Sequence, residues 1–459
     1  MSDWQEAEQR VERAHDLYER GRWEEAVSEL RRAIEINPTI GAWYFNLGIT
    51  LDMMERHDEA LAAYRKALSL EPEDLETLNA AGTDCVRIGR YKQAIRFFER
   101  AQQLDAGFEP CYCNRITAYS ELGEHEKAEE MFYLARQYRE KCPACFYNMG
   151  CSLFARANYE HALWCWRQVL EMEPDYPQIH ARIADVHWAK GQLTEARRHL
   201  MEELRCDPGN LDTLLDLGEL LMEMRLPVAA GEKFRQVLDL EPEETTAHYQ
   251  LGVLADGQGD ADLALERFKF VLQHDRHYSG AHLQIAQIHH RQKNRAEAVY
   301  HANCELAQAD LDESMLLDLG RLFMDMHQLE SARTALERLV EINPQHVEGR
   351  HALAVTLLMA NRLAEGINQC RRVLKIQPKY MLAMSNLALA YISRHDFARA
   401  RYWLGEALDI APEDAQLRQI QNRFRLALAW WKIRQAVGRI AGSFRRRPAA
   451  AALRSMNNE

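Results

Sequence analysis

Apolar residues recur at helical spacing in short blocks along the chain. Residues 42–54 (AWYFNLGITLDMM) place apolar side chains three and four positions apart, and residues 59–70 (EALAAYRKALSL) repeat this spacing after the polar segment ERHD. Pro72 follows one residue later, and proline cannot continue a helix because it lacks the backbone N–H and its ring clashes with the preceding turn. The pattern therefore predicts two helices joined by a short turn and ended near Pro72.

This helical pair recurs at intervals of 34 residues. Eight of the 13 prolines are separated by multiples of 34, namely Pro38, Pro72, Pro174, Pro208, Pro242, Pro344, Pro378 and Pro412. Twelve residues before each of the twelve positions of this series lies a small residue: Ala26, Ala60, Ala94, Ala128, Ala162, Ala196, Ala230, Ala264, Ala298, Ala332, Gly366 and Ala400. Small side chains at fixed helix positions let two helix backbones approach closely, and a bulky replacement would overpack the contact. We therefore predict twelve helix-turn-helix units without insertion or deletion.

Two further features bear on individual units. One position between the paired helices is suited to a left-handed residue at a helix end, and five units carry glycine there: Gly21, Gly89, Gly123, Gly191 and Gly259. The fourth and ninth units depart most from the pattern, at Ile116, Glu140, Glu305 and Asp310. We interpret these two units as weaker points of the array.

The repeated pattern resembles the tetratricopeptide repeat (TPR) family. The second unit matches the family's signature positions at Tyr44, Leu47, Gly48, Leu51, Ala60, Tyr64, Ala67 and Pro72. The resemblance implies an all-α, right-handed superhelical solenoid of twelve TPR units, with the first helix of each unit lining a concave channel. The expected organisation is a short lead (residues 1–6), the array (7–412), a capping or amphipathic helix (413–440) and a basic disordered tail (441–459).

Composition and charge limit the class of protein. Of 459 residues, 47% are hydrophobic and 27% are charged, which excludes a disordered chain. The net charge of −12 is unevenly distributed, because the residues from Asp414 onward contain ten Lys and Arg against two acids. The longest apolar run, LALAWW at 426–431, is too short to span a bilayer. The first residues lack the apolar core of a secretory signal and the ten cysteines suit a reducing compartment, so we expect a cytoplasmic protein.

Acidic residues gather on two of the first helices. Asp212, Asp216, Glu219 and Glu223 follow i, i+4, i+7, i+11 spacing and fall on one helical face, and Glu8, Glu12 and Glu19 repeat the arrangement in the first unit. One interpretation is a solvated polar face, and the other is a docking strip for a basic segment of a partner. In the family, chaperone-binding members carry Lys at a channel position that has no Lys in any of the twelve units here, so that mode of binding is not expected.

Aromatic and aliphatic residues also fall on channel positions of the first helices. In the middle of the array these are Tyr147, Phe154, Trp188 and Tyr249, and near its end Val355, Leu358, Met359, Leu382 and Leu389. Apolar side chains that unit-to-unit packing does not require are typical of a groove for a peptide or helix. The alternative interpretation is that they pack between neighbouring first helices.

Four cysteines have the spacing of paired ligands for zinc or of a redox pair: Cys111, Cys113, Cys142 and Cys145. Cys111 and Cys145 occupy equivalent positions of adjacent units, which makes their proximity plausible. A solenoid does not need a structural metal ion to hold it together, however, so we favour the interpretation that these are small buried cysteines. We therefore expect no metal and no cofactor. The zinc and redox hypotheses remain as alternatives.

Histidines and catalytic motifs give no sign of chemistry. His282 and His289 occupy positions that carry core aromatics in other units, which favours packing over metal binding. No Gly-rich phosphate loop, nucleophile elbow or HExxH motif is present. Because every long segment belongs to a repeat, we expect no catalytic residues and no enzymatic activity.

The C-terminal segment is expected to be a helix that caps the last unit. We assign Leu426, Trp430, Ile433, Val437 and Ile440 to the face that covers the array, and Phe424, Leu428 and Trp431 to the opposite face. Trp430, Trp431, Arg445, Arg446 and Arg447 are the candidate contact residues of this segment. Three interpretations compete: a solubilising cap, a contact with anionic lipid, and a pseudo-ligand for the acidic channel.

Taken together, the sequence predicts a non-catalytic scaffold or adaptor, similar to bacterial assembly and regulatory solenoids, that binds proteins or peptides in its channel. Basic segments are the expected ligands, and nucleic acid is not an expected partner. The alternative is a peripheral membrane assembly factor held at the inner face of the membrane by the basic Trp/Arg tail. Partner identity and oligomeric state stay open, because repeat positions encode the fold rather than the ligand.

Overall fold

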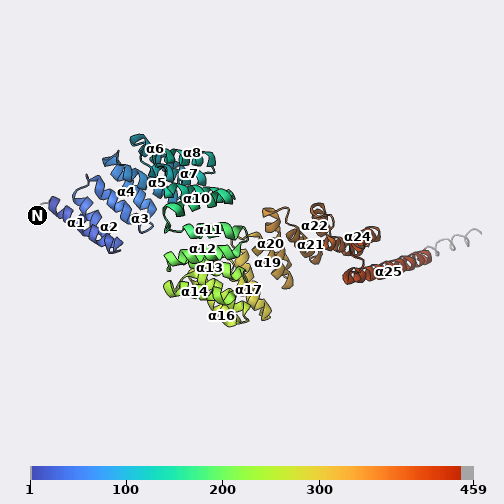
Figure 1. Cartoon of the computed structure of the whole chain (residues 1–459). Helices are drawn as coiled ribbons and strands as arrows, with labels where there is room; N and C mark the ends of the chain where they lie inside the picture. The colour runs from blue at the N-terminus through green and yellow to red at the C-terminus, as the bar shows by residue number, and fades with distance from the viewer. Residues whose placement is uncertain (1–2, 446–459) are drawn as a thin grey trace, which may run out of the picture. The chain divides into compact units, whose positions relative to one another are not determined.

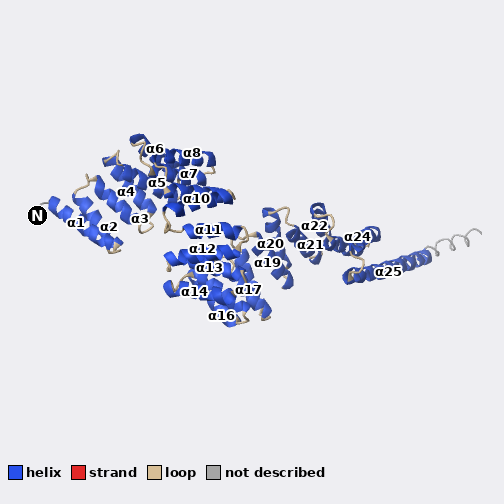
Figure 2. Ribbon diagram, viewed as in Figure 1, coloured by secondary structure: helices blue, strands red, loops and turns tan. Residues whose placement is uncertain are grey.

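The computed structural model describes residues 3–445, and these residues form α-helices without any strand (Figures 1 and 2). The chain divides into two compact units, Met1–Gln236 and Val237–Glu459. The helices that lie wholly in the first unit are α1 (Asp3–Glu19), α2 (Trp23–Ile36), α3 (Gly41–Asp52), α4 (His57–Leu70), α5 (Leu75–Arg87), α6 (Tyr91–Leu104), α7 (Pro110–Glu121), α8 (His125–Tyr138), α9 (Pro143–Ala155), α10 (Tyr159–Met172), α11 (Ile179–Ala189), α12 (Leu193–Cys206) and α13 (Leu211–Glu223).

The boundary between the two units falls within α14 (Pro227–Leu240). The helices of the second unit are α15 (Thr245–Gly257), α16 (Ala261–His274), α17 (Ala281–Arg291), α18 (Arg295–Leu306), α19 (Glu313–Asp325), α20 (Leu329–Ile342), α21 (Val347–Met359), α22 (Leu363–Ile376), α23 (Met381–Ser393), α24 (Phe397–Ile410) and α25 (Ala415–Arg445). The predicted succession of helical pairs is confirmed: odd-numbered helices up to α23 are the first helices of repeats, and even-numbered helices are the second.

Within each unit, helices pack in chain order. Each helix contacts its neighbours in sequence, and first helices of successive repeats also touch, as α5 with α7, α7 with α9, and α19 with α21. The buried core of the first unit is continuous from Ala14 on α1 to Val186 on α11. Side chains on the first helices therefore meet side chains of the next first helix, which is the arrangement that builds a shared surface from separate repeats.

The turn between paired helices contains a left-handed residue in all twelve repeats. The five predicted glycines have φ between +70° and +86°. The equivalent residues of the other seven repeats have φ between +55° and +61°: Glu55, Ala157, Arg225, Lys293, His327, Asn361 and His395. Backbone bonds that flank this residue hold the turn, because Arg56 N–H donates to the Leu51 carbonyl oxygen at 3.0 Å, the pattern of a Schellman helix end. Glycine therefore marks the turn in five repeats, and the turn forms without it in seven.

Three glycines of the first helices lie directly against aromatic rings of the second helices. A Cβ added to Gly82 would lie 2.4 Å from a ring carbon of Phe98, and a Cβ on Gly48 or Gly218 would meet Tyr64 or Phe234 at the same distance. These distances are far below van der Waals contact, and a buried ring has little room to move. The small residue of the first helix thus leaves the space that an aromatic side chain of the second helix fills.

Glu305, one of the predicted departures from the pattern, has a defined structural role. Its side chain is completely buried, and its carboxylate accepts hydrogen bonds from the backbone N–H groups of Gly280 (2.8 Å) and Leu283 (3.0 Å) at the start of α17. Glu203 occupies the equivalent position three repeats earlier and accepts from the N–H groups of Gln178 (2.8 Å) and His180 (3.0 Å) at the start of α11. Neither helix start is capped by its own N-cap side chain. A carboxylate from the second helix therefore caps the first helix of the same repeat.

The terminal helices differ from the predicted boundaries. α1 begins at Asp3, inside the expected lead, and α25 continues to Arg445, beyond the predicted end at residue 440. Residues 441–445, which we expected to be disordered, are helical. Arg446 and Arg447 lie outside the described residues. Among residues 3–445, none of the helices combines the length and apolar character needed to cross a membrane.

The face of α25 that packs on the array is the opposite of the predicted one. Phe424 is buried, Leu428 lies against the core of the last repeats, and the Trp431 ring is 5.5 Å from that of Phe397. Four of the five residues that we assigned to the covering face are exposed: Leu426 (72%), Trp430 (59%), Ile433 (62%) and Val437 (59%). The side chain of the fifth, Ile440, lies outside the described part of the chain. The reason lies earlier in the helix, where the buried residues Leu417 and Ile420 start the helical series that Phe424, Leu428 and Trp431 continue.

Candidate partner-binding surface

α13, a first helix of the first unit, carries four acidic residues and no basic one. We call Asp212, Asp216, Glu219 and Glu223 the acidic strip. Asp212 and Glu223 are exposed at its two ends, while Asp216 and Glu219 are partly buried between them. Because α13 follows α11 in the stack of first helices (Figure 1), side chains of α11 border the strip.

At the centre of the acidic strip, the carboxyl group of Asp216 has a raised pKa. Burial, together with the nearby carboxylates of Asp185, Glu219 and Asp212, raises the pKa of Asp216 to about 6, and Arg182 acts in the opposite direction. Burial also raises the pKa of Asp185 on α11, although Arg182 lies 3.0 Å from its carboxylate. Asp185 therefore belongs to the same negative surface. The sequence analysis did not identify Asp185, because it is the single acidic residue of α11 and forms no acidic series within that helix.

Trp188 lies beside the acidic strip at its Glu223 end. Its indole Nε1–H donates to Glu223 Oε2 at 2.5 Å, so the ring lies beside the last carboxylate of the acidic strip. The sequence placed Trp188 with the aromatic residues of the channel and the strip in a separate group. The structure brings the two groups together, because adjacent first helices present residues 35 positions apart to each other.

Tyr147 borders the same region through Arg182. Arg182 Nε donates to the Tyr147 hydroxyl oxygen at 3.3 Å, and the ring of Tyr147 lies 5.3 Å from that of Tyr176. α9, α11 and α13 thus supply a continuous run of aromatic, cationic and acidic side chains. A surface of this kind presents flat apolar area beside fixed negative charge, which suits an Arg- or Lys-containing segment.

The other predicted aromatic residues do not join the acidic strip. Phe154 packs against Tyr159 and Trp166 of its own repeat, with ring centroids 5.6 and 6.0 Å apart, which fits the packing interpretation. Tyr249 belongs to the second unit, where its ring lies 5.1 Å from that of Tyr278.

Four of the five aliphatic residues predicted near the end of the array line a hollow in the second unit, and the fifth, Leu382, is exposed outside it. Its volume is about 480 Å³, and Val355, Leu358, Met359 and Leu389 contribute to its lining together with Asn386 and Arg423. Of the acids predicted in the first repeat, Glu19 pairs with His15 at 3.4 Å on the exposed face of α1.

The candidate contact residues of the tail are divided between two environments. Trp430 is exposed and lies under the guanidinium of Arg434, 5.4 Å from its ring centroid, while Trp431 packs inward on Phe397. Arg445 is the last residue of α25. Of the predicted pair of tryptophans, Trp430 alone is largely open to a partner.

The cysteines are not simply small buried side chains. Cys113 and Cys145 form a disulfide between α7 and α9, so the expectation of separate reduced thiols is wrong for this pair. Cys111, which the repeat frame placed opposite Cys145, instead donates its thiol hydrogen to the Phe108 carbonyl oxygen at 2.9 Å. The contacts of Cys113 with Cys145, Tyr147 with Arg182 and Trp188 with Glu223 have spacings of 32, 35 and 35 residues rather than 34, since the first helices are staggered.

Models of the tetratricopeptide repeat family match residues 9–73, four further segments (54–107, 147–210, 215–268 and 317–380) and residues 381–411. The four segments of one model alone cover more than half of the chain. The chain belongs to the tetratricopeptide repeat family. Its fold class is therefore that of a TPR solenoid, and TPR proteins generally mediate protein–protein interactions.

Relatives of this TPR chain are distant and longer. It is 21% identical over 417 residues to protein O-mannosyl-transferase TMTC3 from Homo sapiens, across 88% of this chain and 42% of that protein. It is also 21% identical to the protein CTR9 homolog from Arabidopsis thaliana, across 84% of this chain and 40% of the relative. The chain thus spans less than half the length of these curated relatives.

Solved structures with a similar fold include a tetratricopeptide repeat protein from Parabacteroides merdae and yeast Tom70. The first is 17% identical, with a TM-score of 0.46 over 55% of this chain and 99% of that chain. Tom70 is 14% identical, with a TM-score of 0.40 over 93% of this chain and 96% of that chain.

Replacing Asp216 with Asn is expected to stabilise the protein more at pH 7.5 than at pH 4.5. The folded-state pKa of Asp216, about 6, exceeds the unfolded value near 3.9, so its contribution to stability is complete at low pH and is lost as pH rises through 6. Removing the charge should therefore gain about 1–2 kcal/mol at pH 7.5. Urea denaturation at both pH values measures this, and an equal effect at the two pH values would contradict the raised pKa.

Proposed function

We propose that this TPR chain is a non-catalytic scaffold or adaptor whose first unit binds an Arg- and Lys-rich segment of a partner protein along the acidic strip, in the channel lined by first helices. The observation that carries the proposal is the alignment of four carboxylates on one face of α13, a helix without a basic residue. Burial, together with these neighbouring carboxylates and Asp185, raises the pKa of Asp216, which agrees with mutual repulsion among them. A cationic ligand would relieve that repulsion. The bordering Trp188 and Tyr147 add flat surfaces for guanidinium and aliphatic stems.

The test is a titration of a fluorescent Arg/Lys-rich peptide into the full chain, followed by anisotropy. Binding is expected at low ionic strength and should weaken steadily as salt rises, because exposed charges separated by more than about 8 Å are largely screened at physiological ionic strength. A peptide with Gln in place of Arg and Lys is the control and should not bind. Affinity that is independent of salt would contradict recognition by the acidic strip.

Catalysis is not part of the proposal. The relatives named O-mannosyl-transferases are more than twice as long as their match to this chain, so their activity can reside outside the matched TPR region. The residues of the array are engaged in helix pairing, and the surface described above offers carboxylates and aromatic rings for binding. We place the protein in the cytoplasm, with other proteins or peptides rather than nucleic acid as partners.

A second candidate function, a peripheral membrane assembly factor, rests on the exposed side of α25. We call Leu426, Trp430, Ile433 and Val437 the tail stripe. These four side chains are 59–72% exposed and follow i, i+4, i+7, i+11 spacing on one face. Lys432, Arg434 and Arg423 are on the same helix. An apolar stripe with tryptophan and flanking cations is typical of helices that lie on anionic lipid surfaces.

Vesicle sedimentation distinguishes this second candidate from a simple cap. The Trp430→Ser/Ile433→Ser variant should lose binding to vesicles of phosphatidylcholine and phosphatidylserine that the wild type binds. Trp164→Ser, which removes a 48% exposed tryptophan on α10, is the matched control and should bind as the wild type does. Absence of wild-type binding, or equal binding by the double variant, would contradict a membrane role for the tail stripe.

A further inference from the structure

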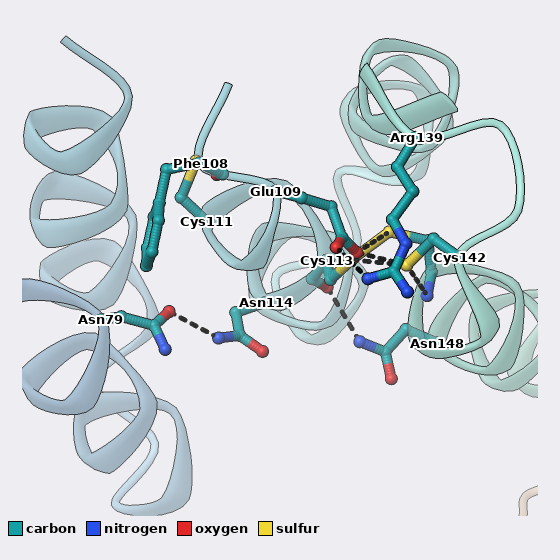
Figure 3. Close-up of a disulfide and its surroundings, with 10 residues drawn as sticks. Asn79, Phe108, Glu109, Cys111, Cys113, Asn114, Arg139, Cys142 and Asn148 are labelled. Atoms are coloured by element: carbon teal, nitrogen blue, oxygen red, sulfur yellow. Dashed lines mark hydrogen bonds and ion pairs between the residues drawn. A yellow bond between two sulfur atoms is a disulfide. The ribbon is translucent and has the colours of Figure 1, made fainter. Parts of the chain in front are cut away.

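Three cysteines and one glutamate converge where α7 and α9 begin. Glu109 immediately precedes α7, and Cys142 is the N-cap residue of α9. Cys113 and Cys145 lie one turn into their helices and are joined as a disulfide. Figure 3 shows the carboxylate of Glu109 directed at Cys113 and Cys142, with Cys111 turned away beside Phe108. We call Glu109, Cys113, Cys142 and Cys145 the sulfur cluster.

The four ligand atoms of the sulfur cluster lie close enough together for one metal ion to contact all of them after a small rearrangement. Glu109 Oε1 lies 3.0 Å from Cys113 Sγ and 3.8 Å from Cys145 Sγ, and it accepts a hydrogen bond from the Cys142 thiol. Cys142 Sγ is 3.4 Å from Cys113 Sγ, and all four ligand atoms lie within 4.8 Å of one another. Tetrahedral zinc with ordinary Zn–S and Zn–O bonds separates its ligand atoms by about 3.5–3.8 Å. To reach these spacings, the bonded pair Cys113 and Cys145 has to move apart, and the Glu109 oxygen has to move away from the sulfurs of Cys113 and Cys142.

An ion pair and a backbone hydrogen bond hold side chains of the sulfur cluster in place, as neighbouring groups usually do for metal ligands. Arg139 Nη1 lies 3.1 Å from the other oxygen of Glu109, which leaves Oε1 facing the sulfurs. The backbone N–H of Cys145 donates to Cys142 Sγ at 3.3 Å, an arrangement that also stabilises a thiolate. Cys142 and Cys145 have the C-x-x-C spacing that presents two sulfurs from one helix start to one ion.

Burial favours a metal ion over a role in thiol exchange with another protein. The exposures of Cys113, Cys142 and Cys145 are 3%, 1% and 0%. A sulfur that exchanges disulfides with a protein partner must be reached by the partner's thiolate. A divalent cation is small enough to enter beside the partly exposed Glu109, and it would satisfy a carboxylate that otherwise faces three sulfurs.

We propose that the sulfur cluster, once its disulfide is reduced, binds one divalent cation with the ligand preferences of zinc through three thiolates and one Glu109 oxygen. A dithiol reductant transfers two electrons and two protons to the Cys113–Cys145 bond, yields two thiols and is itself converted to a disulfide. The cation then replaces the three thiol protons, which are released to solvent. Reoxidation by a disulfide oxidant re-forms the Cys113–Cys145 bond and expels the cation. This site is independent of the acidic strip and of the proposed function.

Cobalt titration of the full chain tests this proposal. The protein is reduced with dithiothreitol, freed of reductant under argon, and titrated with Co²⁺ alone. One Co²⁺ per chain is expected to bind with thiolate-to-cobalt charge-transfer absorption and the intense visible bands of tetrahedral cobalt, and Zn²⁺ should displace it. Protein that was never reduced should show neither band. Reduced wild-type protein without thiolate–cobalt absorption would overturn the proposal, and so would equal binding by the oxidised protein.

Three variants assign the ligands. Cys142→Ser keeps the disulfide partners and should lower cobalt affinity at least about tenfold. Cys111→Ser is the matched control, because its sulfur lies outside the cluster, and it should bind as the wild type does. Glu109→Gln should retain charge transfer but change the visible bands. Equal losses in Cys111→Ser and Cys142→Ser, or an unchanged spectrum in Glu109→Gln, would contradict the assigned ligand set. Circular dichroism of each oxidised variant establishes that it is folded.

Discussion

Replacing Glu305 with Ala is expected to lower the free energy of unfolding by about 2–4 kcal/mol, because hydrogen bonds to a charged group contribute about 1.5–3 kcal/mol and buried donors left without a partner cost about 1–3 kcal/mol each. The carboxylate of Glu305 is completely buried and accepts from two N–H groups at the start of α17. Alanine would leave these donors unsatisfied in the core. The loss should be measured by urea denaturation of the full chain.

This expectation is the reverse of what the repeat pattern suggests. Equivalent residues in other repeats are Ala33, Ala67, Ala101, Ala135 and Ala407, so Glu305→Ala restores the commonest residue. Glu305→Gln should show a smaller loss, since its amide oxygen still accepts one of the two bonds. Glu266→Ala, an exposed change on α16, is the control and should shift stability by less than about 0.5 kcal/mol. A Glu305→Ala variant as stable as this control would show that the buried carboxylate does not cap α17.

Neutralising the acidic strip is expected to weaken binding of the Arg/Lys-rich peptide by about 10- to 100-fold at low salt. The variant is Asp212→Asn, Asp216→Asn, Glu219→Gln and Glu223→Gln together. Exposed ion pairs contribute about 0.2–1 kcal/mol each, so four of them amount to about 0.8–4 kcal/mol. The expected 10- to 100-fold loss corresponds to about 1.4–2.8 kcal/mol, in the middle of that range. Anisotropy titration measures the difference, and the two proteins should converge at high salt.

The matched control changes the same net charge elsewhere in the first unit. Glu35, Glu126, Glu130 and Glu160 are exposed acids on the second helices α2, α8 and α10, and replacing all four with Gln removes four charges without touching a first helix. This variant should bind nearly as the wild type does. If both quadruple variants lose affinity equally, binding depends on overall charge, and the acidic strip is not a docking site.

The repeat architecture was predictable because it depends on residues whose side-chain size or backbone conformation determines where a helix ends or how closely two helices pack. Pro72 and its equivalents end units, and the small residue at Gly82 is required by the Phe98 ring. Turn residues such as Glu55 were not identifiable, because their left-handed conformation is imposed by the hydrogen bonds of the surrounding helix end. The face of α25 was predicted wrongly because Leu417 and Ile420, which set the phase of its buried series, were left out of the pattern.

The candidate site was only partly predictable for a geometric reason. Spacing within α13 identified the acidic strip, but contributions from the next helix depend on how first helices are staggered. Trp188 meets Glu223 and Tyr147 meets Arg182 at separations of 35 residues, and Cys113 meets Cys145 at 32. A frame that compares equivalent positions, 34 apart, pairs Cys111 with Cys145 instead. The stagger can be seen only when the helices are placed in space.

The most direct test of recognition by the acidic strip is the number of protons released when the basic peptide binds. Asp216, with a pKa of about 6, is half protonated at pH 6, and a cation beside it should expel up to about half a proton per complex. Calorimetric titration at pH 6 in buffers of different ionisation enthalpy measures this number. The account predicts release by the wild type at pH 6, little at pH 8, and none at either pH by Asp216→Asn. Peptide binding without proton release by the wild type at pH 6 would contradict it.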